Sequence, residues 1–213
     1  MAQYDLIIRG GSVIDGTGAD ARSADVAVGN GIIVDVGDVS GSAAREIDAD
    51  GALVIPGIVD IHTHYDGQAT WDHRLQPSSW HGVTTVVTGN CGVGFAPVHD
   101  ADHGTLIELM EGVEDIPGAA LHEGLRWNWN SFGEFMDAVE EIPHDVDVAL
   151  QVPHGALRLN VMGERGANHE AATPDDIAAM AELARHGIEA GALGFTTSRT
   201  RNHKTSTGAY TPT

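Results

Sequence analysis

Two histidines stand two residues apart directly after an apolar run, in the stretch "GALVIPGIVDIHTHYD". In an extended strand the side chains of Asp60, His62 and His64 point to one face, because alternate residues share a face. Two imidazoles on one face can bind the same ion, and imidazole is a common zinc ligand. A carboxylate such as Asp60 can orient a ligating ring from behind it. The alternative is that this spacing arises by chance.

The single cysteine, Cys91, lies in the glycine-rich stretch "VVTGNCGVG", just past a second strand-like run. A thiolate is a strong zinc ligand and can bridge two metal ions. The flanking glycines indicate a loop that comes close to another group. Cys91 is therefore a candidate third ligand beside His62 and His64, and the alternative for a lone thiol is a small buried side chain.

A basic segment stands out in an acidic chain. The chain has 31 acidic against 11 basic residues, a formal charge of -20, and "SRTRNHK" holds Arg199, Arg201 and Lys204. The overall charge disfavours nucleic acid and anionic membranes as partners, and a local positive patch would attract a small anionic substrate. His154, in "QVPHGALR" after a third strand-like run, is a further candidate for substrate contact. A solvated loop and a structural histidine are the alternatives.

The elements that position these residues change character along the chain. Residues 4 to about 53 predict short strands separated by glycine-containing turns, which indicates a small β-sandwich-type domain over residues 1–53. From residue 54, apolar runs alternate with helix-like segments, which is typical of parallel β/α units. The runs are "LVIPGIVDIH", "VTTVVTGN", "VDVALQVP" and "GALGFTTS". Four strands are half of a TIM-type (β/α)8 barrel, so an α/β fold with a partial barrel is expected over residues 54–213.

Two of the expected helices have clear ends. Ser131 with Glu134 predicts a capping box, and Thr173 predicts a cap followed by Pro174 in the first turn. Gly191 is expected to end the second of these helices.

The chain carries no signal-peptide pattern and no apolar run long enough to span a bilayer. Its one cysteine cannot form an internal disulfide, which fits a reducing compartment. A cytoplasmic location is the prediction.

Several stretches together resemble the amidohydrolase superfamily, specifically its N-acyl-D-amino-acid deacylase (D-aminoacylase) branch. They are "VIPGIVDIHTHYDGQATWDHRLQPSSWHGVTTVVTGNCGVGFAPV", "ELMEGVEDIPGAAL", "VPHGALRLNVMGERG" and "AGALGFTTSRT". The "TGNCG" element is more discriminating than the histidine pair, because PGxxDxHxH is shared by many amidohydrolases. The resemblance covers essentially the whole chain.

The resemblance implies a metal-dependent hydrolase that cleaves the amide of an N-acyl-D-amino acid to a carboxylate and a D-amino acid. His62, His64 and Cys91 would then hold zinc, one ion tightly and a second ion more weakly where two are bound. In this branch a cysteine after the second strand replaces the carboxylated lysine that many relatives carry on the fourth strand, and "GALGFTTSRT" accordingly has no lysine in place.

The sequence also departs from the family pattern. The family completes its site with histidines from the fifth and sixth strands and with an aspartate from the eighth, the general acid/base, which would lie beyond Thr213. His203 stands in a basic loop and is not assigned as a ligand. The expectation is a fragment or a truncated relative with little or no turnover by itself. A cyclic-amide hydrolase of the dihydroorotase or hydantoinase type and a non-catalytic scaffold remain as alternatives.

Overall fold

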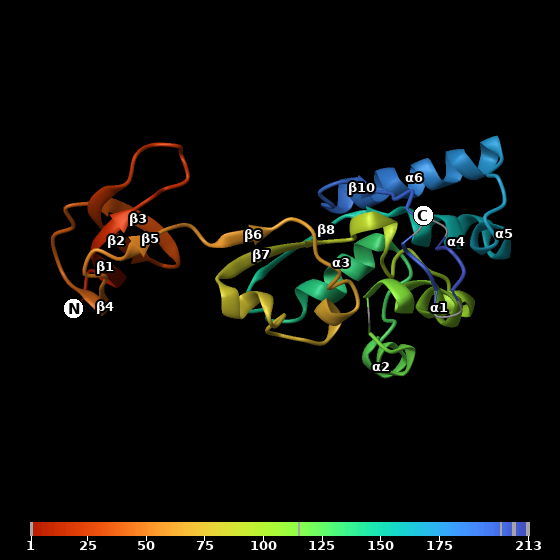
Figure 1. The fold of residues 1–213 in the computed structure, drawn as a ribbon, viewed down its shortest axis with the longest axis horizontal. Helices are drawn as coiled ribbons and strands as arrows, with labels where there is room; N and C mark the ends of the chain where they lie inside the picture. Colours follow the sequence, from red (N-terminus) through yellow and green to blue (C-terminus); the bar gives the residue numbers. More distant parts are fainter. Residues whose placement is uncertain (1, 115, 201, 206–207, 212–213) are drawn as a thin grey trace. The chain divides into compact units, whose positions relative to one another are not determined.

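Figure 1 shows the fold in a computed structural model, which describes residues 2–114, 116–200, 202–205 and 208–211. The chain divides into two compact units, one up to Gly57 and one from Ile58 onward. The first unit extends past residue 53 because strand β5 (Leu53–Val54) pairs with strand β1. The assignment of the two units as separate domains remains a prediction.

The N-terminal unit contains a sheet in which the strands follow the order β3-β2-β1-β4, with β5 also paired to β1. Its other strands are β1 (Tyr4–Val13), β2 (Arg22–Gly29), β3 (Ile32–Gly37) and β4 (Ala43–Asp48). Asn30 and Gly31 have φ values of 53° and 74° between β2 and β3, which confirms one of the predicted glycine-containing turns. The described strands of this unit form one sheet, and the sandwich arrangement remains a prediction.

The C-terminal unit has the mixed α/β character that the sequence predicted. Strands β6, β7 and β8 pair in parallel in that order, and β9 pairs in parallel with β10. Their bounds are β6 (Ile58–Asp60), β7 (Val83–Thr88), β8 (Asp147–Leu150), β9 (Val152–Pro153) and β10 (Phe195–Thr196). Because β6, β7 and β8 run in the same direction, the residues that follow them are brought to the same edge of the sheet.

Within the described residues, two short 3-10 helices, Gln68–Thr70 and Ser78–His81, lie between β6 and β7, whereas three α-helices lie between β7 and β8 and three between β9 and β10. The α-helices are α1 (His103–Glu114), α2 (Gly118–Gly124), α3 (Phe132–Glu140), α4 (His154–Met162), α5 (Glu164–Ala167) and α6 (Pro174–Ala190). The predicted capping boxes of Ser131 on α3 and Thr173 on α6 are confirmed, and Gly191 follows α6 with φ 121°. None of the helices in the described ranges is long and apolar enough to cross a membrane.

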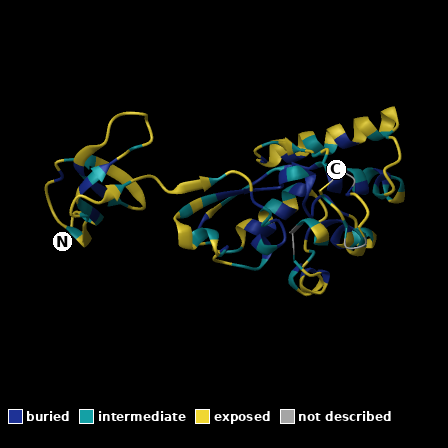
Figure 2. Ribbon diagram, viewed as in Figure 1, coloured by how far each residue is buried: buried dark blue, intermediate teal, exposed yellow. Residues whose placement is uncertain are grey.

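The core of the C-terminal unit contains buried residues from strands β7 and β8 and from helices α1, α3 and α4, and the interior of this unit is coloured as buried in Figure 2. Its largest fully buried side chains include Phe95, Leu106 and Phe135. The outer strands are less covered, since Val59 on β6 is 53% exposed and Phe195 on β10 is 47% exposed. On α6, Met180 is buried while Ile177 is 56% exposed, so the apolar residues of this helix are only partly covered in the described chain.

Candidate metal centre

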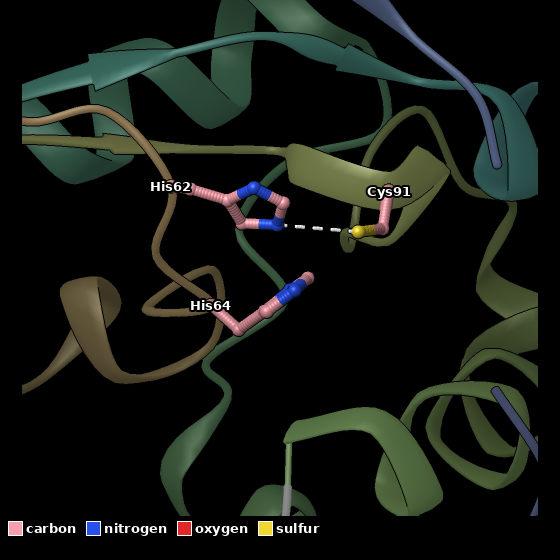
Figure 3. Close-up of side chains that lie close together, drawn as sticks. All are labelled: His62, His64 and Cys91. Carbon is pink, nitrogen blue, oxygen red and sulfur yellow. Dashed lines mark hydrogen bonds between the residues drawn. The ribbon is translucent and has the colours of Figure 1, made fainter. Parts of the chain in front are cut away.

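The two histidines and the cysteine converge at the ends of two neighbouring parallel strands (Figure 3). His62 and His64 lie just after β6, and Cys91 lies in a 3-10 turn that spans Asn90–Gly92 after β7. Each side chain offers one ligand atom, and these atoms all lie within 4.8 Å of one another. Nε2 of His62 is 3.2 Å from Sγ of Cys91.

The segment that carries the histidines leaves the sheet early but keeps its alternation. β6 ends at Asp60, so both histidines lie beyond the strand. Thr63, between them, is buried, and its N–H and Oγ1 both donate to the Val87 carbonyl, at 3.0 and 2.8 Å. With Thr63 held against β7, the two imidazoles project to the other side. Oδ1 of Asp60 accepts from the backbone N–H of His62 at 3.2 Å. This hydrogen bond orients the His62 backbone, whereas the sequence predicted that Asp60 would orient an imidazole ring.

The turn that carries Cys91 is left-handed at several positions. Gly89, Cys91 and Gly92 have φ values of 81°, 58° and 74°. Glycine adopts this conformation freely, whereas a left-handed L residue costs about 1–2 kcal/mol. A Cβ on Gly89 would also lie 2.1 Å from the Gln151 carbonyl oxygen. The turn therefore requires glycine at position 89, and Cys91 is held in a strained conformation of the kind that clusters at functional sites.

Two side chains from distant parts of the unit hold the backbone of Gly89, one at its N–H and one at its carbonyl. Oδ1 of Asp66, which is 1% exposed, accepts from the Gly89 N–H at 2.6 Å. Thr196 on β10 donates its hydroxyl to the Gly89 carbonyl and accepts from the Gly92 N–H at 3.0 Å. Asp66 thus links the histidine segment to the cysteine turn, and Thr196 links that turn to β10.

Asn90 forms a third connection inside the site. Its Nδ2 donates to the carbonyl oxygens of Val87 and Thr63 at 2.8 and 3.2 Å, and its Oδ1 accepts from Nε2 of Gln151 at 3.0 Å. The buried amide therefore joins the histidine segment, β7 and the residue between β8 and β9. Such hydrogen bonds fix the spacing of the candidate metal-binding side chains before a metal ion binds.

Burial sets the protonation of the site. Burial, with smaller contributions from His62 and His203, lowers the pKa of His64 to about 4, so its imidazole is neutral at pH 7 and able to bind a metal. Burial, and then the nearby Asp66, raises the pKa of the Cys91 thiol. Burial also raises the pKa of Asp66 to about 7. In the absence of an ion, the thiol is protonated, and metal binding would release its proton.

The donor set fits zinc. Two imidazole nitrogens and one sulfur are ligand types that zinc prefers, and donors on a tetrahedral zinc lie about 3.5 Å apart. Because the three candidate ligand atoms lie within 4.8 Å of one another, the longest separation needs to shorten by about 1 Å at most. Nδ1 of His64 is buried and has no hydrogen-bond partner among the described residues, which leaves a costly unsatisfied atom that an ion could satisfy.

Two of the predicted substrate contacts lie together. His154, the first residue of α4, and Arg199 line one cavity of about 490 Å³, together with Arg158. Nδ1 of His154 is 3.0 Å from Oγ1 of Thr197, and burial, followed by Arg158 and Arg199, lowers its pKa. Lys204 is not among the lining residues of this cavity, and its Nζ lies 5.8 Å from the centre of the Tyr210 ring. Arg201 lies outside the described residues.

Sequence reasoning missed two residues at the site. The ring of His203 lies 6.4 Å from that of His64, although the sequence placed His203 in a loop without a role. Asp66 continues the alternation of Asp60, His62 and His64, which was the available signal for it. Nothing comparable in the sequence pointed to His203.

Comparison with known proteins agrees with this geometry. Residues 45–213 match the family model described as the amidohydrolase family. The chain belongs to the amidohydrolase family. It is 36% identical over 195 residues to D-aminoacylase from Alcaligenes xylosoxydans xylosoxydans, covering 91% of this chain and 37% of that protein. It is 38% identical over 197 residues to N-acyl-D-aspartate deacylase from the same organism, with 92% and 37% covered.

Solved structures give the same result for this amidohydrolase. A structure from work on the binuclear metal centre of D-aminoacylase matches with a TM-score of 0.75 and 39% identity, covering 91% of this chain and 38% of that one. N-acyl-D-glutamate deacylase from Bordetella bronchiseptica, complexed with zinc and a phosphonate inhibitor, matches with a TM-score of 0.69 and 33% identity. The chain thus spans less than two fifths of the length of the first relatives that it matches.

Proposed function

We propose that this chain belongs to a zinc-dependent hydrolase that cleaves the amide bond of N-acyl-D-amino acids to a carboxylate and a D-amino acid. The observation that carries the proposal is the approach of the Cys91 sulfur to Nε2 of His62, at 3.2 Å, with His64 in the same donor set. The relatives named D-aminoacylase and N-acyl-D-aspartate deacylase support the substrate class.

His62, His64 and Cys91 would hold one ion tightly and, where two ions are bound, the second ion more weakly. When bound, zinc supplies a Lewis acid that polarises the scissile carbonyl. The chain's own contribution is positional, because Asp66 and Thr196 fix the cysteine turn and Asn90 fixes the histidine segment. Asp60 supports the site from behind through the His62 backbone.

The substrate is a small anion, and the formal charge of -20 would repel it at long range. Arg199, Lys204 and His154 are proposed to attract and bind its carboxylate near the site. Arg158 shares the cavity that His154 and Arg199 line, which adds a second guanidinium there.

The fold is proposed to be part of an eight-stranded barrel. The exposed apolar residues on β6 and β10 support this arrangement, as does the parallel pairing of β6 with β7 and of β10 with β9, since parallel sheets are usually covered on both faces. The family's general acid/base is an aspartate on a later strand, so no residue of this chain is assigned that role. A cytoplasmic location remains a prediction.

The test combines metal analysis with hydrolysis assays. The 213-residue chain is expected to bind zinc, and C91S and H62A are each expected to reduce its affinity at least about tenfold, as losses at metal sites commonly do. The full translation product of the gene, loaded with zinc, is expected to hydrolyse N-acetyl-D-amino acids in preference to their L forms. Ser79→Ala, which lies outside the donor set, is the control substitution.

The possible results separate the functions. Zinc binding with hydrolysis of dihydroorotate or hydantoins, and none of N-acyl-D-amino acids, would replace the proposal with a cyclic-amide hydrolase. A wild-type protein that binds no zinc would favour a non-catalytic scaffold.

A further inference from the structure

After β10, residues 203–205 lie against residues 208–211, and we call these two described stretches together the 203–211 hairpin. Lys204 and Tyr210 form an antiparallel bridge, and the Thr205 N–H donates to the Ala209 carbonyl at 2.7 Å. The Lys204 ammonium also lies 5.8 Å from the centre of the Tyr210 ring. These contacts hold residues 203–205 against residues 208–211. Residues 206–207 lie outside the described chain.

The backbone of the hairpin comes very close to helix α1 at Gly112. A Cβ on Gly112 would lie 1.9 Å from the Lys204 carbonyl oxygen, a distance that no side-chain carbon can adopt. Glycine within a helix is otherwise unfavourable by about 1 kcal/mol relative to alanine. The absence of a side chain at Gly112 therefore has a local reason, which is to let the hairpin backbone reach the helix.

This docking brings the imidazole of His203 to the metal centre. Its ring lies 6.4 Å from the ring of His64, nearly perpendicular to it at 86°. The Thr211 N–H donates to the His203 carbonyl at 3.2 Å and fixes the backbone there. Nδ1 of His203 is buried without a hydrogen-bond partner among the described residues. Such an atom is unfavourable unless a ligand satisfies it.

His203 lies beside the donor set, which comprises His62, His64 and Cys91 within the described chain. We propose that His203 is a further substrate-binding residue, whose imidazole donates a hydrogen bond to the carboxylate of the N-acyl amino acid and which Gly112 positions through the hairpin. The inference rests on the proposed function. Two cationic residues are close to His203 in the sequence, Lys204 directly after it and Arg199 four residues before it. Positive charge close to His203 would favour binding of an anionic group beside it.

The test measures binding to the zinc-loaded 213-residue chain by calorimetry, with two ligands that differ in one group. N-acetyl-D-methionine carries the carboxylate, and N-acetyl-D-methioninamide lacks it. His203→Ala is expected to weaken binding of the carboxylate ligand about tenfold to a hundredfold, and to leave binding of the amide and of zinc unchanged within about twofold. His203→Gln, which keeps an N–H donor, is expected to restore part of the affinity.

Helix α1 offers a matched pair for the positioning claim. Gly112→Ala is expected to weaken the carboxylate ligand as His203→Ala does, because the new methyl group displaces the hairpin. Gly104→Ala, on the same helix with nothing within 4 Å of its Cβ, is expected to behave as wild type. Histidine Cε1–H resonances report on the His203 ring, and circular dichroism verifies that each variant is folded.

Several results would overturn the inference. Equal losses for the carboxylate and the amide, or no loss for either, would remove the hydrogen bond to the carboxylate. A fall in zinc affinity as large as that of H62A would make His203 a metal ligand. A folded Gly112→Ala variant that binds the carboxylate ligand with wild-type affinity would show that Gly112 does not position His203. A wild-type chain that binds zinc but neither ligand would refute the proposed substrate class, and this inference with it.

Discussion

The two units of the molecule use carboxylates in opposite ways. In the N-terminal unit, Arg9 on β1 donates to Asp25 at 2.9 Å and to Glu46 at 3.3 Å, and it also donates to the Val39 carbonyl. The Gly10 N–H and Arg9 lower the pKa of Asp25, and Arg9 lowers that of Glu46. In the C-terminal unit, Asp66 is 1% exposed, and burial raises its pKa to about 7.

The two kinds of carboxylate have different roles: the ion-paired ones stabilise the fold, whereas the buried one lies at the candidate metal centre. The paired acids of the first unit are charged across the physiological range and hold strands together. The buried acid of the second unit is unfavourable in its charged form, and it is retained where it links the histidine segment to the cysteine turn. Groups with strongly perturbed pKa values in a polar cluster are typical of functional sites.

The largest expected effect comes from the glycine that Asp66 holds. Gly89→Ala would place a methyl group 2.1 Å from the Gln151 carbonyl oxygen at a φ of 81°, so we expect a destabilisation of about 3–5 kcal/mol and a loss of zinc affinity. Gly82→Ala has a similar φ of 84° but open space around the Cβ, with its nearest atom at 4.0 Å, and should cost only about 1–2 kcal/mol. Urea denaturation and zinc titration measure both; equal effects at the two glycines would break the comparison.

A smaller effect is expected from the buried acid. Because folding raises the pKa of Asp66 from 3.8 to about 7, the folded state holds the proton more tightly, and stability falls as pH rises through that window. Asp66→Asn removes this fall, so the variant should gain about 2–3 kcal/mol relative to wild type between pH 5 and pH 8 in the metal-free chain. Denaturation at the two pH values measures the gain. A constant difference between the two proteins would show that Asp66 does not titrate there.

The smallest effect concerns the first unit and has the opposite sign with pH. Because the pKa values of Asp25 and Glu46 are lowered, the stability from their pairing with Arg9 is present above about pH 4 and is lost on acidification through their folded pKa values. Arg9→Gln should therefore destabilise β1 and β2 at pH 7 and converge with wild type near pH 2. Hydrogen exchange of the β1 and β2 amides measures this, and a gap that widened in acid would contradict it.

Local signals in the sequence predicted local structure well. The caps at Ser131 and Thr173 were correct because each depends on side chains within one turn of helix. The convergence of His62, His64 and Cys91 followed from a single topological fact, that parallel strands end at the same edge of a sheet. That the three residues bind metal remains a prediction.

The missing parts depend on contacts between distant residues. The ring of His203 lies beside that of His64 in a hairpin whose backbone approaches Gly112, and no periodicity encodes that contact. The raised pKa of Asp66 follows from its burial, which depends on the whole unit. Strand β6, the first strand of the C-terminal unit, is shorter than the apolar run suggested. Pro56 and Gly57 interrupt that run, and β6 begins only at Ile58.

The two hydrogen bonds of Thr196 have a consequence for the order of folding. They connect β10 to Gly89 and Gly92 across 107 and 104 positions of the chain. Contacts of such separation form late, since much chain must be ordered first. We therefore expect the imidazoles and the thiol to be synthesised early but to reach their final spacing late in folding, so that an ion arriving during synthesis would meet loosely held donors.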